Sequence, residues 1–249
     1  MKASWQLGGP DALENGTADE RRDSVASELI ELWDERRSSG AKIARRLSLG
    51  TDEFYVKASP LKPSAARRHA WRSRLFSIAP PRLAERENLA FLNRVGIPAA
   101  RPFLAGVFWD RGRPVYQALA TLWIPDSTSL AERLESGAFS ASEARDLGLL
   151  ASRLHAHGFV HRDLFARNLI LCPERGWTVL DAWRGGTRRG WRGPAWDLAC
   201  LLAEPGVTIP ASHERALLDA YAESGSARTL ARLEREKRKV ARRYSVKRA

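Results

Sequence analysis

The stretch from residue 158 to residue 183 constrains this chain more than any other part of its sequence. It reads GFVHRDLFARNLILCPERGWTVLDAW, with Asp163 in a His-Arg-Asp triplet, Asn168 five residues later and Asp181 after an apolar run. The short apolar segments predict strands joined by a hairpin, with these polar residues on loops at their ends. Two carboxylates and an amide supply oxygen ligands for Mg²⁺ beside a proton acceptor, which is the combination that phosphoryl transfer from ATP requires.

Each of these residues has an ordinary interpretation when it is taken alone. A His-Arg-Asp triplet is common at protein surfaces, and an aspartate after apolar residues often caps a strand. The spacing of Asp163 and Asn168, however, is that of the catalytic loop of protein kinases. Together with Asp181, this spacing predicts a kinase-like active site.

Lys57 ends the apolar segment Phe-Tyr-Val-Lys of a predicted strand. One interpretation is that its side chain only reaches solvent along the strand. A helix predicted over about residues 83–95 follows, however, and it offers Glu87, with Glu85 as the rival acid. A strand lysine paired with a helix glutamate holds the α and β phosphates of ATP in kinases. We favour Glu87 because Phe91, four residues later, lies on the same helix face.

Segments with strand-like patterns dominate before residue 123, and helical patterns dominate after it. The predicted strands cover about residues 28–34, 42–49, 53–59, 104–108 and 114–122, and the first of these also fits a short helix. The clearest helix is predicted over residues 141–157, with a capping box of Ser140 and Glu143 before it and Gly158 after it. Further helices are predicted from Trp196 and over residues 211–223.

This distribution predicts an α+β, two-lobed fold of the protein-kinase kind, with a small strand-rich N-lobe and a short helical C-lobe. Residues 1–25 carry little apolar periodicity and are expected to be a disordered lead-in. The predicted divisions after it are an N-lobe over 26–122, a hinge over 123–127, a C-lobe over 128–226 and a basic tail over 227–249.

The formal charge of +12 is concentrated near the C-terminal end of the sequence. Residues 228–249 hold ten Lys or Arg against two Glu, a net charge of +8. This segment fits a helix lying on an anionic membrane surface and fits a plain solvated tail equally well. Nucleic acid is not an expected partner, because Tyr244 is the only aromatic residue among these basic ones.

The two cysteines predict the compartment. Cys172 and Cys200 lie in apolar contexts without metal-ligand spacing, so we expect buried thiols in a reduced compartment. The first residues lack an apolar signal core, and no run approaches the roughly 18 apolar residues that suggest a membrane span. The expected location is the cytoplasm, with peripheral contact to the inner membrane as a further expectation.

Over about residues 30–205 the chain resembles the lipopolysaccharide core kinase family, whose protein-kinase-like members phosphorylate Kdo or heptose sugars of the inner core. The arginine three residues after Asp181 is also like that family and unlike ordinary protein kinases. The segments that carry the resemblance are Phe54–Lys57, Arg86–Pro98, His157–Asn168, Val179–Arg184 and Trp196–Leu202.

The resemblance implies a role for each matching residue. Asp163 would accept the proton of the sugar hydroxyl or orient that hydroxyl. Lys57, oriented by Glu87, would neutralise phosphate charge. The remaining roles implied by the family are Mg²⁺ binding by Asn168 and Asp181, and structural support of the loop by His161 and Asp197. ATP and Mg²⁺ are the implied cofactors.

The chain also departs from the kinase pattern. No Gly-x-Gly-x-x-Gly motif lies near the first strands, and the candidate phosphate loop is Arg36–Gly40, with Ser38, Ser39 and Gly40 as binding residues. An ordinary polar turn explains this segment as well. Asp181 is followed by Ala-Trp in place of Phe-Gly, and this loss of the glycine predicts a metal site without a flipping switch.

The metal-binding aspartate is followed by an arginine-rich loop. Its arginines are expected to bind an anionic acceptor, such as the carboxylates and phosphates of a Kdo-bearing glycolipid, although a solvated loop is the simpler interpretation. The residues concerned are Arg184, Arg188, Arg189 and Arg192.

The function favoured by the sequence is ATP-dependent phosphorylation of an inner-core lipopolysaccharide sugar. A small-molecule or antibiotic phosphotransferase, or an atypical protein kinase, would keep the fold and change the acceptor. A pseudokinase or a basic nucleic-acid-binding protein is the non-catalytic alternative. Intact Lys57, Asp163, Asn168 and Asp181 argue against a dead site.

Overall fold

The structure is a computed structural model that describes residues 4–8, 17–36, 42–49, 51–187 and 192–245. The chain divides into two compact units, each with its own internal contacts. The first unit comprises residues 1–90 and 100–123, and the second comprises residues 91–99 and 124–249. The division after Trp123 falls at the start of the segment predicted to be a hinge.

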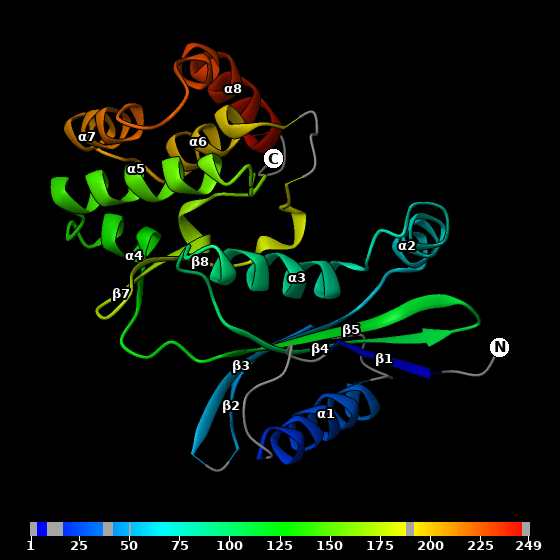
Figure 1. Ribbon diagram of the computed structural model, residues 1–249. Helices are drawn as coiled ribbons and strands as arrows, with labels where there is room; N and C mark the ends of the chain where they lie inside the picture. Colours follow the sequence, from blue (N-terminus) through cyan, green and yellow to red (C-terminus); the bar gives the residue numbers. More distant parts are fainter. Residues whose placement is uncertain (1–3, 9–16, 37–41, 50, 188–191, 246–249) are drawn as a thin grey trace. The chain divides into compact units, whose positions relative to one another are not determined.

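The first unit is built on a five-stranded antiparallel sheet in the order β1-β4-β5-β3-β2 (Figure 1). Its strands are β1 (Ser4–Gly8), β2 (Ile43–Leu49), β3 (Asp52–Pro60), β4 (Pro102–Asp110) and β5 (Arg113–Leu122). Four of these match predicted strands. The prediction of a disordered lead-in over residues 1–25 is wrong in part, because β1 pairs with β4.

The segment predicted as a strand over residues 28–34 is helical. It belongs to α1 (Thr17–Arg36), which also covers part of the predicted lead-in. Val25, Leu29 and Leu32 are buried on one side of this helix and join the core formed with the sheet. Their spacing of four and three residues is the helical repeat, which outweighs the short strand-like alternation within the segment.

Two further helices follow β3. The basic stretch after it forms α2 (Pro63–Phe76), which packs against β5. Helix α3 (Pro81–Arg94) corresponds to the helix predicted over residues 83–95, and its residues up to Ala90 belong to the first unit.

The second unit is mostly helical. A three-stranded antiparallel sheet, in the order β6-β7-β8, carries the predicted hairpin between its last two strands. The strands are β6 (Thr128–Ser129), β7 (Leu169–Cys172) and β8 (Gly176–Val179). The α-helices are α4 (Leu130–Glu135), α5 (Ala141–Ala156), α6 (Pro194–Leu202), α7 (Ala211–Ala222) and α8 (Ala227–Ser245). The antiparallel sheet followed by a helical part confirms the predicted α+β class.

The basic segment at the end of the chain is a packed helix and not a separate tail. Helix α8 contacts α6, and it buries Leu233 and Val240 on the inner side. Tyr244 makes an edge-to-face ring contact with Phe165 at 5.0 Å between centroids. The apolar side of α8 is therefore already used inside the second unit, which corrects the prediction of a separate basic tail over residues 227–249.

Within the described ranges, none of the helices has both the length and the apolar character needed to cross a bilayer.

Candidate active site

A buried carboxylate on α6 holds the backbone of the loop that carries Asp163. Asp197 is fully buried, and its two oxygens accept hydrogen bonds from the backbone N–H groups of His161 and Arg162, both at 2.6 Å. Arg162 has a φ of 65°, in the left-handed region. Hydrogen bonds to a buried carboxylate are strong, so they can hold this unfavourable backbone conformation in place.

His161 connects the same loop to the strand end that precedes Asp181. Its side chain is fully buried, and Nε2 lies 2.8 Å from the carbonyl oxygen of Leu180, to which it donates. The backbone N–H of Leu180 in turn donates to the carbonyl oxygen of Asn168 at 2.9 Å. These contacts fix the two loop segments against each other within the second unit.

Asp163 lies at the centre of this arrangement. Its backbone carbonyl accepts a hydrogen bond from Nδ2 of Asn168 at 2.8 Å, and the residue is 7% exposed. Two guanidinium groups approach its carboxylate: Arg184 lies 3.5 Å from Oδ1, and Arg167 lies 3.8 Å from Oδ2. Within the described part of the chain, the buried Oδ1 accepts no hydrogen bond, so this oxygen keeps its capacity to accept a proton.

Asp181 follows β8 and precedes a short 3₁₀ turn over Ala182–Arg184. Its φ of 54° is in the left-handed region, an uncommon conformation for a residue with a side chain. Such strain is found most often at functional sites, where the surrounding structure enforces it. Here the neighbouring residue Leu180 is bonded on both sides, to His161 and to Asn168.

The first unit places Lys57 against a glutamate of α3, and that glutamate is Glu85. The Nζ of Lys57 donates to Oε1 of Glu85 at 3.2 Å, and Arg82 forms an ion pair with the other carboxylate oxygen. Glu85 is fully buried, whereas Glu87 is exposed. The predicted Lys57–Glu87 pair is therefore wrong, because residues two apart on a helix point to different sides.

Helix α3 carried a signal that favoured Glu85. Leu89 and Leu92 are both fully buried, and they lie four and seven residues after Glu85. This is the spacing of one helix face, so the buried acid is the one that belongs to the apolar stripe. Phe91, which favoured Glu87 in the sequence, packs instead on Phe159 of the second unit, to which Phe91 itself belongs.

The matching family model covers residues 29–225 and is described as the lipopolysaccharide kinase (Kdo/WaaP) family. This chain belongs to that family. It is therefore a kinase, as the sequence predicted. No curated protein matches the chain in sequence.

One of the solved structures that resemble this chain shares its fold. A structure of WaaP in complex with acyl carrier protein matches 94% of this chain and 99% of the WaaP chain, at 16% identity and a TM-score of 0.57. A glucosamine kinase is also similar, at 16% identity, with 86% of this chain and 74% of that chain covered and a TM-score of 0.41. The likeness to WaaP confirms the predicted kinase-like fold.

The residues of this kinase suit a magnesium ion by their chemistry. Nδ2 of Asn168 donates to the backbone carbonyl of Asp163, so the amide oxygen is the atom that could bind a metal ion. The carboxylate of Asp181, directly after the residue bonded to Asn168, would supply the charged oxygens. An amide and a carboxylate, completed by phosphate oxygens, are a donor set that Mg²⁺ accepts.

The predicted acceptor arginines fall into three groups. Arg184 stacks on Trp183, with its guanidinium carbon 4.6 Å from the ring centroid, and it reaches the Asp163 carboxylate. Arg192 is buried on Trp196, and its Nη1 donates to the carbonyl oxygen of Arg162 at 3.3 Å. Arg188 and Arg189, like the predicted phosphate loop Ser38–Gly40, lie outside the described residues.

Arg192 therefore supports the loop backbone, which corrects its prediction as an acceptor ligand. Burial lowers its pKa, and the nearby positive charge of Arg243 on α8 lowers that pKa further. A guanidinium remains charged even so, because its ordinary pKa is far above neutral. The charge is held by the loop carbonyl and the Trp196 ring, and it faces the protein interior.

Two residues that the sequence did not single out also hold the loop. Glu204, just after α6, accepts a hydrogen bond from the backbone N–H of Ala166 at 2.7 Å and one from Nη1 of Arg167 at 2.6 Å. Arg167 thus links Glu204 to Asp163. Arg167 lies within the loop motif, but nothing in the sequence marks Glu204, because its contact joins positions 38 residues apart.

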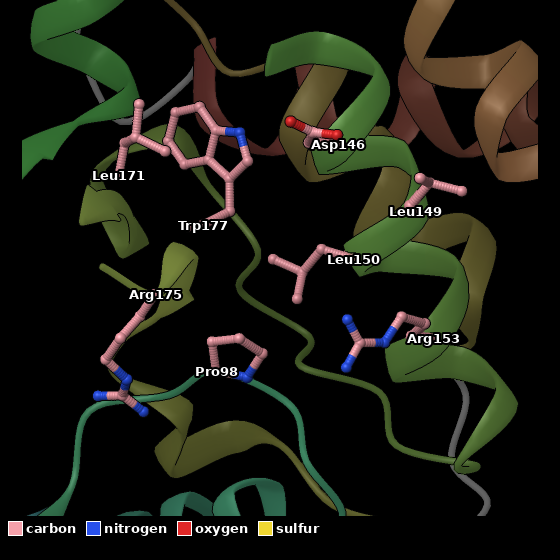
Figure 2. A pocket seen from close by; sticks show the side chains of 9 residues that line it. Pro98, Asp146, Leu149, Leu150, Arg153, Leu171, Arg175 and Trp177 are labelled. Atoms are coloured by element: carbon pink, nitrogen blue, oxygen red, sulfur yellow. The ribbon is translucent and has the colours of Figure 1, made fainter. Parts of the chain in front are cut away.

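A pocket of about 240 Å³ lies elsewhere in the second unit, and none of its lining residues is a predicted site residue. Figure 2 shows Pro98, Leu150 and Trp177 around it, with Arg153 and Arg175 at its sides. Both guanidinium groups donate to backbone carbonyls of the segment before β4, at Gly96 and at Ala99. The pocket therefore marks where this segment is attached to α5 and to the β7–β8 hairpin.

Proposed function

We propose that this kinase transfers the γ-phosphate of ATP to a hydroxyl of an inner-core lipopolysaccharide sugar, either Kdo or heptose. The observation that carries the proposal is the Asp163 loop. Buried hydrogen bonds hold the backbone of this loop and the Asn168 amide, and Asp181 follows Leu180, which the same network holds, in a chain of the Kdo/WaaP family. Two further proposals depend on this one: that the acceptor is anionic, and that the kinase contacts the membrane.

Asp163 accepts the hydroxyl proton in the proposed reaction. The hydroxyl oxygen forms a bond to the γ-phosphorus, the bond from that phosphorus to the β–γ bridging oxygen breaks, and ADP leaves with the electron pair. Asn168 and Asp181 would hold Mg²⁺, which would supply positive charge against the phosphates. Lys57 neutralises further phosphate charge, and the buried Glu85 keeps its ammonium group in place.

Arg184 is the described arginine best placed to serve the acceptor. It lies 3.5 Å from the Asp163 carboxylate and is about one third exposed. A guanidinium in this position can bind a carboxylate or phosphate of the sugar beside the residue that accepts its proton. We propose that the acceptor is anionic for this reason, and that the kinase works at the cytoplasmic face of the inner membrane.

The decisive experiment measures ADP release by the purified full chain with Mg-ATP and inner-core glycolipids that end in Kdo or in heptose. Turnover that is lost in Asp163→Ala supports the proposal, and phosphate on the sugar, located by mass spectrometry, identifies the hydroxyl. Turnover with an aminoglycoside or a protein, and with none of the glycolipids, would instead show that this family member uses another acceptor.

A further inference from the structure

The outer side of α2 exposes three large apolar side chains that no described element covers. Trp71 and Leu75 are each 57% exposed, and Phe76 is 53% exposed. Trp71 and Leu75 lie four residues apart and share a helix face. The rings of Trp71 and Phe76 meet edge to face at 5.3 Å between centroids, so these side chains form one continuous patch.

Four arginines of the same helix surround this patch. Arg67 and Arg68 lie one turn before Trp71, and Arg72 and Arg74 lie within one turn after it, and all four are exposed. The inner side of the helix is different, because its buried residues are Ala66 and His69. No aspartate or glutamate occurs between residues 54 and 84, so this positive charge has no acidic residue beside it in the sequence.

The helix is held firmly in the first unit. It packs against β5, and the backbone N–H of Leu61, just before it, donates to the carbonyl oxygen of Val115 at 2.8 Å. Pro63 begins the helix, and Ser77 ends it in the left-handed conformation, with Ser73 Oγ donating to the carbonyl oxygen of Ile78 at 2.7 Å. The apolar patch and its arginines are thus presented on a preformed helix.

We infer that α2 is an interfacial helix that binds the surface of an anionic lipid bilayer. Apolar side chains in the middle of a helix face, flanked by arginines, are the features of helices that lie in the plane of a membrane surface. Tryptophan is favoured at that depth, and arginine stems reach from the apolar layer to the headgroup phosphates. Charge complementarity therefore selects an anionic bilayer, and three apolar side chains allow shallow insertion only.

The inference goes beyond the proposed function and does not depend on which acceptor is phosphorylated. It also replaces the C-terminal segment as the membrane-binding element, since the apolar side of α8 is packed against α6. Helices α2 and α8 are both basic, so charge does not distinguish them, but the exposure of their apolar side chains does. Only α2 carries exposed large apolar residues among the described residues.

The test is sedimentation of the full chain with vesicles of phosphatidylcholine alone and of phosphatidylcholine mixed with phosphatidylglycerol. We expect binding to the mixed vesicles that weakens with added salt. Trp71→Ser/Leu75→Ser should reduce this binding at least tenfold, and Arg67→Gln/Arg68→Gln should reduce it about 25-fold, since each of the two basic residues contributes roughly fivefold near such a surface. The matched control is Arg232→Gln/Arg238→Gln on α8, which removes the same charge and should bind like the unchanged protein.

A second readout reports the depth of α2 directly. Brominated phosphatidylcholine in the mixed vesicles should quench part of the fluorescence of the nine tryptophans, and Trp71→Phe should remove that part. Circular dichroism melting of each variant checks that the fold is retained. None of the substituted residues belongs to the proposed catalytic machinery.

Several results would overturn the inference. One is equal binding of the unchanged protein to vesicles with and without phosphatidylglycerol, and another is loss of binding in the α8 variant alone. A third is that the unchanged protein does not bind vesicles but is a dimer in light scattering, whereas the Trp71→Ser/Leu75→Ser variant is a monomer. The patch would then join two copies of the chain. Kinase activity on a soluble acceptor should be the same in all variants, so failure of the proposed function would be seen separately.

Discussion

At the scale of single residues, the two glutamates near the start of α3 allow a matched comparison. Glu85→Gln should lower kcat/KM at least about tenfold, because the half-buried Lys57 ammonium loses its charged, buried partner. Glu87→Gln removes the same charge from an exposed position and should change kcat/KM less than twofold. The measurement is steady-state ADP release, and similar losses in both variants would contradict the assignment of Glu85.

Replacement of the proposed proton acceptor separates chemistry from nucleotide binding. Asp163→Asn keeps the shape of the side chain and should lower kcat by about 10²- to 10⁴-fold, the usual contribution of a general base. Affinity for Mg-ATP, measured by isothermal titration calorimetry, should remain within about threefold. A variant that loses nucleotide affinity to the same extent as kcat would show that Asp163 serves the nucleotide site.

His69 predicts a pH dependence of stability. Burial lowers its pKa below the ordinary value of 6.5, and Arg68 and Arg72 lower it further. Below pH 6.5 the unfolded chain takes up a proton that the folded chain does not, so the free energy of unfolding should fall as the pH falls from 6.5 toward the folded pKa.

Urea unfolding of the unchanged protein and of His69→Gln, at pH 7.5 and at pH 5.5, checks this prediction. The loss of stability between the two pH values should be smaller in the variant. Equal losses would mean that other groups are responsible.

The sequence grouped the predicted residues of the loop by their spacing and misassigned one acid. Asp163, Asn168 and Asp181 could be predicted as site residues because they lie within one short segment, where spacing carries the information. Glu85 was passed over because its partner lies 28 residues away on a strand, and only the rotation of α3 decides which acid faces it. Contacts of this kind depend on how a helix packs against a strand, which the spacing of residues within one segment does not reveal.

At the scale of elements, α5 and α7 pack so closely that a single methyl group matters. A Cβ added at Gly148 on α5 would overlap the backbone carbonyl of Leu217 on α7. Gly148→Ala should therefore lower the free energy of unfolding by about 1–3 kcal/mol, the usual cost of overpacking. Gly193→Ala is the control, because a methyl group there meets open space at an ordinary φ of −109°. Equal melting temperatures of both variants would contradict this packing.

The same scale shows where sequence patterns succeed. Helix α5 was predicted within one residue, because the capping box of Ser140 and Glu143 is a local signal and both of its hydrogen bonds are present. Helix α1 was predicted as a strand, because the apolar alternation of residues 28–34 was read in too short a window. Val25 and Leu32 show the helical repeat only when the whole helix is considered.

At the scale of the whole molecule, the basic helix α8 has a structural role, although its charge suggests a solvated tail. Truncation after Ser226 removes α8 and uncovers the side of α6 that it contacts. Loss of the buried Leu233 and Val240 alone should cost about 3 kcal/mol or more. The truncated chain should therefore melt at a clearly lower temperature in calorimetry, and Arg232→Gln/Arg238→Gln, which keeps α8, should not. An unchanged melting temperature after truncation would contradict the packing of α8.

The two thiols of the second unit have a practical consequence for spectroscopy. Cys172 and Cys200 are both buried, and burial raises the pKa of the Cys200 thiol far above its usual range, so thiol-reactive dyes should leave the native protein unlabelled. A single cysteine introduced on the exposed side of α2, such as Ser64→Cys, then becomes the only reactive site without any change to the natural sequence elsewhere. An environment-sensitive dye at that position would follow the arrival of the protein at a bilayer in real time, and the same preparation would report unfolding when the buried thiols begin to react.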